Sequence, residues 1–220
     1  MSISELAGCD VTSTRGVGTS RRHIRLDPTR AMDIAFALIG LLLTWPLFVF
    51  IALGVTAQDG GAAIFRQQRI GREGRMFDCL KFRSMRVGAE QALPSASDPE
   101  WQAMRKLTHD PRVTSLGRLL RRFSLDELPQ LINELRGEMS LVGPRPIVID
   151  EAARYGRRLT DYCTVRPGLT GLWQVSGRNA VPYPRRVAMD VWLVRNRTIG
   201  VYLAILARTV PAVLSRRGVS

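Results

Sequence analysis

Two adjacent carboxylates, Asp126 and Glu127, begin an apolar-periodic stretch in the segment RRFSLDELPQL. Successive residues of a helix point about 100° apart, so one carboxylate could face a substrate while the other holds a divalent cation. Ser124 is the expected N-cap of this helix, with Glu127 as its capping-box partner. The helix dipole together with Arg121 and Arg122 would keep both carboxylates ionised, and an ionised aspartate can attack phosphorus. An acidic pair in a first turn is also typical of simple capping, so its surroundings decide its meaning.

Those surroundings contain several side chains that could bind phosphate. Arg145 lies in a G-P-R-P turn and Arg166 precedes a Pro-Gly turn. Such turns hold the guanidinium as a preorganised fork for phosphate oxygens, whereas a run of arginines is usually a solvated face. The candidate phosphate-binding residues are Lys81, Arg83, Arg118, Arg121, Arg145 and Arg166.

The composition narrows the class of protein. Of 220 residues, 45% are hydrophobic and 23% charged, which suits one medium domain with a membrane element and excludes a disordered chain. Lys and Arg number 32 against 19 Asp and Glu, a net charge of +13, and only Lys81 and Lys106 are lysines. The arginine excess indicates either a genomic codon bias or a surface that meets phosphate on nucleic acid, anionic lipid or nucleotide.

Cysteine and histidine offer no further chemistry. Cys9, Cys79 and Cys163 lie far apart without a C-x-x-C pair, which predicts a reducing compartment. His23 and His109 have no neighbouring ligand at metal spacing. We therefore expect neither a zinc site nor histidine acid–base catalysis.

Residues 34–57 form an uncharged apolar segment between Asp33 and Asp59. This segment is long enough to cross a bilayer core of about 30 Å. It is too long for a signal peptide and too uniformly apolar for most core helices of soluble proteins. Pro46 near its centre predicts a kink, because proline removes one backbone hydrogen bond.

Arginines flank this segment on both sides. A helix that crosses the membrane should carry its arginine excess on the cytoplasmic side only. The balance therefore favours a helix that breaks at Pro46 and returns to the face it entered, with a single span as the alternative. The flanking arginines are Arg15, Arg21, Arg22, Arg25 and Arg30 before it, and Arg66, Arg69, Arg72 and Arg75 after it.

From Gly60 onward the sequence predicts one polar domain without internal repeats. Residues 62–71 and 76–85 predict two short strands. Apolar residues at helical spacing predict helices over residues 114–120 and 125–135.

The tail alternates apolar and basic residues from Val187 to Arg217. This pattern predicts one or two amphipathic helices that end near Pro211. Their apolar faces either pack against the domain or lie in the membrane interface.

Three motifs follow the apolar segment in order: KFRSM (81–85), SLDELPQLINELRGEMSLVGPRP (124–146) and VRPGLTGLWQVSGRN (165–179). Together they closely resemble the bacterial sugar transferases, the monotopic phosphoglycosyl transferases that start exopolysaccharide, capsule and glycan assembly. The resemblance runs from about Thr29 to Thr209. The chain looks like the minimal form, without the extra N-terminal membrane helices and soluble domain of longer members, and is most similar to exopolysaccharide galactosyl- or glucosyl-phosphate transferases.

The resemblance implies a reaction and its location. A sugar 1-phosphate would pass from a UDP-sugar to polyprenyl (undecaprenyl) phosphate, giving polyprenyl diphosphate-sugar and UMP, at the cytoplasmic face of a bacterial inner membrane. It implies that Asp126 is the nucleophile that forms a phosphosugar–enzyme intermediate, and that Glu127 is tied to an essential Mg²⁺. Membrane lipid and a second copy of the chain are further implied partners. The family's remaining substrate contacts fall on Lys81, Arg121, Arg145 and Asp190.

The expected fold class is α/β, mostly helical with a small β-hairpin or sheet. We expect a basic, flexible N-terminal segment (residues 1–30) and a re-entrant membrane helix (residues 31–58). A cytosolic catalytic domain with interfacial C-terminal helices would follow (residues 59–220).

Three positions depart from the family pattern. Trp45 precedes Pro46 where serine is common, and the Thr44 hydroxyl could replace the serine's bond to the backbone. The family's L-D-x-x-Y-V segment reads MDVWLV. Tyr202 stands where aspartate is common.

The alternative to an enzyme is a membrane-anchored basic protein that binds nucleic acid or acts as an assembly scaffold. Nucleic-acid binding predicts a helix-turn-helix or an aromatic stacking platform. The sequence suggests neither, and its basic residues are dispersed, so nucleic acid is not an expected partner.

Overall fold

The computed structural model describes residues 28–89 and 110–214. These residues are mostly helical with two small two-stranded sheets, which confirms the predicted mostly helical fold with a hairpin. The predictions for the basic N-terminal segment, Cys9, His23, His109 and the tail beyond Leu214 lie outside the described residues.

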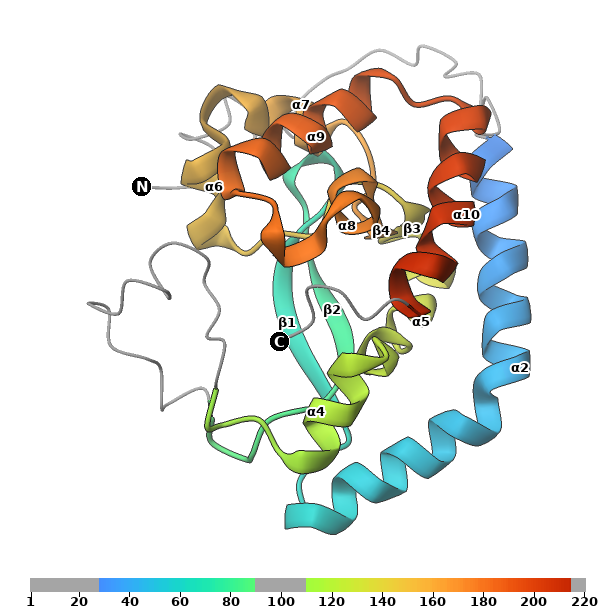
Figure 1. Ribbon diagram of the computed structural model, residues 1–220, viewed down its shortest axis with the longest axis vertical. Helices are drawn as coiled ribbons and strands as arrows, with labels where there is room; N and C mark the ends of the chain where they lie inside the picture. Colours follow the sequence, from blue (N-terminus) through green and yellow to red (C-terminus); the bar gives the residue numbers. More distant parts are fainter. Residues whose placement is uncertain (1–27, 90–109, 215–220) are drawn as a thin grey trace, which may run out of the picture.

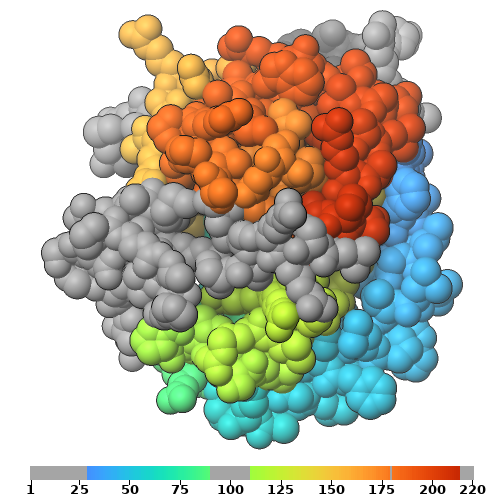
Figure 2. All heavy atoms as spheres, viewed as in Figure 1, coloured from blue at the N-terminus to red at the C-terminus, as the bar shows by residue number. Residues whose placement is uncertain are grey.

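Helix α2 (Pro28–Asp59) contains the whole apolar segment and bends partway along its length (Figure 1). Pro46 lies inside it and is the identifiable cause of a bend. As predicted, the Thr44 hydroxyl bonds to the backbone, donating to the Gly40 carbonyl oxygen at 2.7 Å. The side chains of Leu42 and Leu43 are 73% and 74% exposed, and only 11% of the most apolar stretch is buried. A core helix of a soluble protein would be covered, whereas α2 forms the right and lower margin of the molecule in Figure 2.

The predicted hairpin is confirmed. Strand β1 (Ile64–Ile70) pairs antiparallel with β2 (Met76–Phe82), and the turn between them contains the 3-10 helix η1 (Arg72–Gly74). The ring of Phe82 packs on that of Phe48 in α2, with centroids 4.6 Å apart. The hairpin is therefore joined to the apolar helix at this end.

Helix α4 (Ser115–Arg122) begins where predicted, with the Thr114 hydroxyl accepting a hydrogen bond from the Gly117 amide at 2.9 Å. The predicted continuous helix over residues 125–135 is wrong. A 3-10 turn, η2 (Leu125–Glu127), comes first, and α5 (Gln130–Arg136) follows it. The predicted Ser124 cap is also wrong: its φ of 57° is left-handed and its side chain makes no capping bond, whereas an N-cap needs extended backbone.

A short parallel sheet was not predicted. Strand β3 (Ser140–Val142) pairs with β4 (Gly168–Thr170). A core of buried side chains lies beside β1, where the Tyr162 hydroxyl donates to the Ile70 carbonyl oxygen at 2.7 Å. The segments between the two strands are α6 (Ile149–Tyr155), η3 (Gly156–Arg158) and α7 (Leu159–Cys163).

The C-terminal part confirms two helices, α9 and α10, over the alternating apolar and basic tail, but Pro211 does not end the second one. Pro211 lies inside the last helix rather than ending it, since proline removes only one backbone bond near a terminus. Leu193 and Tyr202 are buried, while Trp192 and Leu203 are nearly half exposed, so each helix packs one face on the domain and leaves another uncovered. The segments are α8 (Leu172–Ser176), η4 (Arg178–Ala180), α9 (Tyr183–Arg195) and α10 (Ile199–Leu214).

Candidate active site

The acidic pair lies in η2, between the end of α4 and the start of α5. The left-handed residue Ser124 turns the chain sharply just before the pair. Asp126 is 8% exposed and lines a cleft of about 1640 Å³. Lys81, Arg121, Glu127 and Arg145 line the same cleft. The fold therefore brings the predicted nucleophile together with three of the predicted phosphate-binding residues.

Glu127 is held between two cations. Its Oε1 atom lies 2.6 Å from Lys81 Nζ on β2 and 3.6 Å from Arg145 Nη1 in the turn after β3. The side chains of Lys81 and Glu127 are 18% and 20% exposed. Burial alone would raise the pKa of Glu127, but Lys81 and Arg145 outweigh it and lower that pKa to about 2. Glu127 is therefore a fixed negative charge at any physiological pH.

The pKa of Asp126 is shifted in the opposite direction, upward. Burial raises the pKa of its carboxyl, Lys81 and Arg121 oppose that effect, and the charge of Glu127 adds to it. The pair does not lie in the first turn of an α-helix as predicted, because it forms part of η2 and α5 begins only at Gln130. The site contains one strongly acidic carboxyl group beside one whose proton is held more tightly.

The loop after β2 orients the side chain of Arg121. Its Nε atom donates to Ser84 Oγ at 2.8 Å, and the Thr114 amide donates to the Ser84 carbonyl oxygen at 3.1 Å. Gly117 makes this close approach feasible, because a Cβ atom there would lie 1.9 Å from the same carbonyl oxygen. The guanidinium of Arg121 is thereby directed at the cleft rather than at solvent.

Three predicted phosphate binders are engaged elsewhere. Arg83 lines the cleft but bonds to the end of α2, with Nη2 2.5 Å from Asp59 Oδ1. Arg118 donates to the Val113 carbonyl oxygen, at the start of its own helix. Arg166 donates to the Gly137 carbonyl oxygen at 2.7 Å, where α5 ends, as basic residues commonly do at helix C-termini. Arg118 and Arg166 do not line the cleft of the acidic pair.

Asp190 lies at the floor of the cleft. It is 1% exposed and accepts a hydrogen bond from the Tyr155 hydroxyl at 2.8 Å. Burial raises its pKa to about 7, against the hydrogen bond from Tyr155. Such a covered carboxyl group is better placed to support cleft residues than to touch a substrate.

Trp173 is a cleft residue that sequence reasoning missed. The guanidinium carbon of Arg145 lies 5.9 Å from its ring centroid, and that of Arg186 lies 4.7 Å away. The ring thus contacts the arginine that pairs with Glu127. Its place in the VRPGLTGLWQVSGRN motif is the signal that could have identified it.

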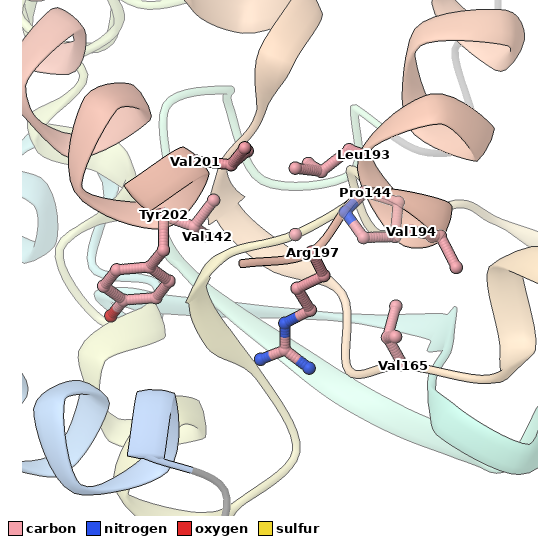
Figure 3. Close-up of a pocket in the computed structure, with 9 residues that line it drawn as sticks. Val142, Pro144, Val165, Leu193, Val194, Arg197, Val201 and Tyr202 are labelled. Carbon is pink, nitrogen blue, oxygen red and sulfur yellow. The ribbon is translucent and has the colours of Figure 1, made fainter. Parts of the chain in front are cut away.

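A second, very small cavity lies between β3 and the junction of α9 with α10 (Figure 3). Its volume is about 10 Å³, too little for anything larger than a water molecule. Arg197 at its edge donates to Thr29 Oγ1 at 2.7 Å. This cavity is a packing gap between β3 and the last two helices, and neither residue of the acidic pair lines it.

The predicted Mg²⁺ would find few protein ligands near the acidic pair. Among the residues that the structure describes, no three His, Cys, Asp or Glu side chains cluster in a way that could hold an ion. Mg²⁺ commonly takes only one or two protein carboxylates, with substrate phosphates and water as its other ligands. Both ion pairs of Glu127 use Oε1, so the acidic pair fits a cation that a bound diphosphate also coordinates.

The fold and the cleft define a class: a protein with an exposed, membrane-type helix that joins a domain carrying an acidic pair among basic side chains. The chain belongs to the bacterial sugar transferase family, which matches residues 25–216. The resemblance predicted from the motifs is confirmed.

Relatives of known name support this membership. The undecaprenyl-phosphate galactose phosphotransferase of Salmonella typhimurium is 49% identical over 195 residues, which are 86% of this chain and 41% of that protein. The exopolysaccharide production protein ExoY of Rhizobium meliloti is 48% identical over 196 residues, 86% of each chain. The UDP-glucose:undecaprenyl-phosphate glucose-1-phosphate transferase of Xanthomonas campestris is 35% identical over an alignment of 225 residues, gaps included, that covers 98% of this chain and 45% of that protein. The chain spans less than half the length of the first and third of these relatives.

Proposed function

We propose that this chain transfers a sugar 1-phosphate from a UDP-sugar to undecaprenyl phosphate, giving undecaprenyl diphosphate-sugar and UMP. The observation that carries the proposal is the buried Asp126 beside a Glu127 held between Lys81 and Arg145 in one cleft. The names of the Salmonella and Xanthomonas relatives support the lipid acceptor, and that of the Xanthomonas relative supports a UDP-sugar donor. The product would be the first lipid-linked intermediate of exopolysaccharide or glycan synthesis.

The reaction divides into two displacements at one phosphorus atom. First, an Asp126 carboxylate oxygen attacks the phosphorus that bears the sugar, and the bond from that phosphorus to the bridging oxygen breaks. UMP leaves with the electron pair, and the sugar phosphate is bound to Asp126 as an acyl phosphate. Next, a phosphate oxygen of undecaprenyl phosphate attacks the same phosphorus, and Asp126 leaves as a carboxylate.

The basic residues of the cleft serve both displacements. Lys81, Arg121 and Arg145 offer charge-assisted hydrogen bonds to the diphosphate oxygens on which charge develops. Burial raises the pKa of the Asp126 carboxyl group, and the same cations favour the ionised form that attacks. Bound at Glu127, Mg²⁺ would neutralise diphosphate charge as a Lewis acid.

The contacts of α2 support a re-entrant arrangement. Near its start, Arg30 donates to the Glu134 carbonyl oxygen at 2.6 Å; at its end, Asp59 pairs with Arg83. A straight helix of this length would extend about 48 Å and carry its two ends to opposite faces of a bilayer. Because both ends contact the same domain and the helix bends (Figure 1), we infer that α2 enters and leaves the membrane on one face, which would be the cytoplasmic face of the bacterial inner membrane.

The same arrangement would bring the cleft near lipid. Half-exposed apolar side chains on α9 and α10, among them Trp192 and Leu203, would lie in the membrane interface. A soluble UDP-sugar and a lipid phosphate could then meet at the headgroup plane.

The experiment that tests the function is UMP release from a panel of UDP-sugars, with undecaprenyl phosphate and Mg²⁺, by the full chain in lipid nanodiscs. We expect the wild-type chain to release UMP with at least one sugar, and we expect Asp126→Asn to abolish that release. Asp161→Asn, which changes an aspartate outside the lining of the cleft, is the matched control and should leave release unchanged. Absence of UMP release with every sugar would contradict the proposal and favour a scaffold.

A further inference from the structure

One carboxylate oxygen of the membrane helix accepts three hydrogen bonds from the domain. Asp33 lies on the second turn of α2 and is 1% exposed. Its Oδ1 atom is 2.7 Å from the Tyr202 hydroxyl, 3.0 Å from Ser140 Oγ and 3.0 Å from the Leu141 amide nitrogen. A buried acceptor with this many donors fixes the relative position of the segments that it joins.

Those segments are α2, β3 and α10. Tyr202, which departs from the family pattern, crosses from α10 with its hydroxyl end directed toward α2 (Figure 3). Its substitution for the common aspartate is thereby explained: the phenol supplies a donor to Asp33, where an aspartate would add a second negative charge.

Strand β3 leads directly to the active site. It ends at Val142, and the next three residues form the turn that presents Arg145 to Glu127. The turn is tightly packed, because a Cβ atom on Gly143 would lie 2.7 Å from the Arg166 carbonyl oxygen. Gly168 donates to the Pro144 carbonyl oxygen at 2.8 Å. A shift of β3 would therefore move Arg145 with it rather than be absorbed in a loose loop.

We propose that Asp33 is a positioning residue for the transfer reaction: by fixing β3 to the membrane helix, it sets the place of Arg145 against Glu127. This inference rests on the proposed function for its kinetic consequences, but its structural consequence is independent of them. Asp33 itself does not line the cleft.

The structural consequence is tested by hydrogen exchange on the full chain in nanodiscs. In Asp33→Ala, the five amides of residues 140–143 and Arg145 should exchange at least about tenfold faster, while those of β1 keep their wild-type rates. The matched control is Thr29→Val, which removes the bond from Arg197 at the same end of α2 and none of the three bonds that Asp33 accepts. Unchanged exchange at these five amides in Asp33→Ala would overturn the proposal, whatever the activity of the enzyme.

The kinetic consequence is tested by a double-mutant cycle with Arg145→Lys. Asp33→Ala should lower kcat/KM for UMP release at least about tenfold in the wild-type background, and less than about threefold when Arg145→Lys is already present. Asp33→Asn, which keeps an acceptor oxygen, should restore most of the lost activity. Equal losses in both backgrounds would indicate a merely structural residue and would overturn the proposal.

Two milder variants keep the proposal testable if Asp33→Ala does not fold. Tyr202→Phe and Ser140→Ala each remove one of the three donors, and each should give a smaller loss of kcat/KM that also disappears in the Arg145→Lys background. Absence of UMP release by the wild-type protein would instead refute the proposed function, and the exchange measurement would still decide the role of Asp33.

Discussion

Lys81 is the closest cation to the acidic pair, and its removal should change how the activity depends on pH. The ammonium group lies 2.6 Å from Glu127 Oε1, and both side chains are largely buried. Two unit charges at such a site interact by about 4 kcal/mol at an effective dielectric constant of 20. Since about 1.4 kcal/mol corresponds to one pH unit, Lys81→Met should move the acid limb of the activity profile upward by up to about three units.

The direction follows from the two carboxyl groups. Loss of Lys81 raises the pKa of Glu127 from about 2 and removes one of the cations that oppose the raised pKa of Asp126. Both changes favour protonated, inactive forms at low pH, and the limb reports the pair together. Arg145, 3.6 Å from Glu127, remains and limits the shift.

The assay is kcat/KM for UMP release between about pH 5 and pH 9, with Lys81→Arg as the control that keeps the charge. Lys81→Arg should retain an acid limb close to that of the wild type. An acid limb in Lys81→Met that coincides with the wild-type limb would refute the electrostatic reasoning, even if the overall rate falls.

Two further predictions concern stability and topology. Burial raises the pKa of Glu134 to about 9, so the folded protein keeps a proton that the unfolded chain releases above about 4.5, and stability falls as the pH rises between these values. Glu134→Gln should therefore raise the free energy of unfolding more at pH 8 than at pH 5, by on the order of a few kcal/mol, with a larger rise in Tm at pH 8; an equal effect at both pH values would contradict this. Cysteines introduced at the exposed positions Ala31 and Gln58, near the two ends of α2, should both resist a membrane-impermeant thiol reagent in intact spheroplasts and react after lysis. Labelling of either one in intact spheroplasts would indicate a single span.

Sequence patterns predicted the helices and strands whose formation depends on residues close together in the sequence. The hairpin followed from short strands around a glycine turn, and the start of α4 followed from the apolar spacing after Thr114. The left-handed Ser124 was not predictable from its type, because it is the packing of η2 against β2 that requires the turn. The β3–β4 pairing joins segments 28 residues apart in sequence, and three-residue strands leave no periodic signal.

The site was predictable where basic residues lie within or beside the sequence motifs that also carry the acidic pair. Lys81, Arg121 and Arg145 were named from the sequence, and the structure gathers them around Asp126 and Glu127. Arginine type alone could not separate these residues from arginines that bind helix-terminal carbonyl oxygens, since both need the same fork of donors. Only the tertiary placement of the helix ends distinguishes the two uses.

The central claim is that Asp126 carries the sugar phosphate between donor and lipid. The most direct measurement is mass spectrometry of the full chain after incubation with the accepted UDP-sugar and Mg²⁺ but without undecaprenyl phosphate. We predict that the peptide containing Asp126 gains the mass of the sugar phosphate, that addition of undecaprenyl phosphate removes it, and that Asp126→Asn never acquires it. UMP formation that continues in Asp126→Asn, or an adduct on a different residue, would contradict the account.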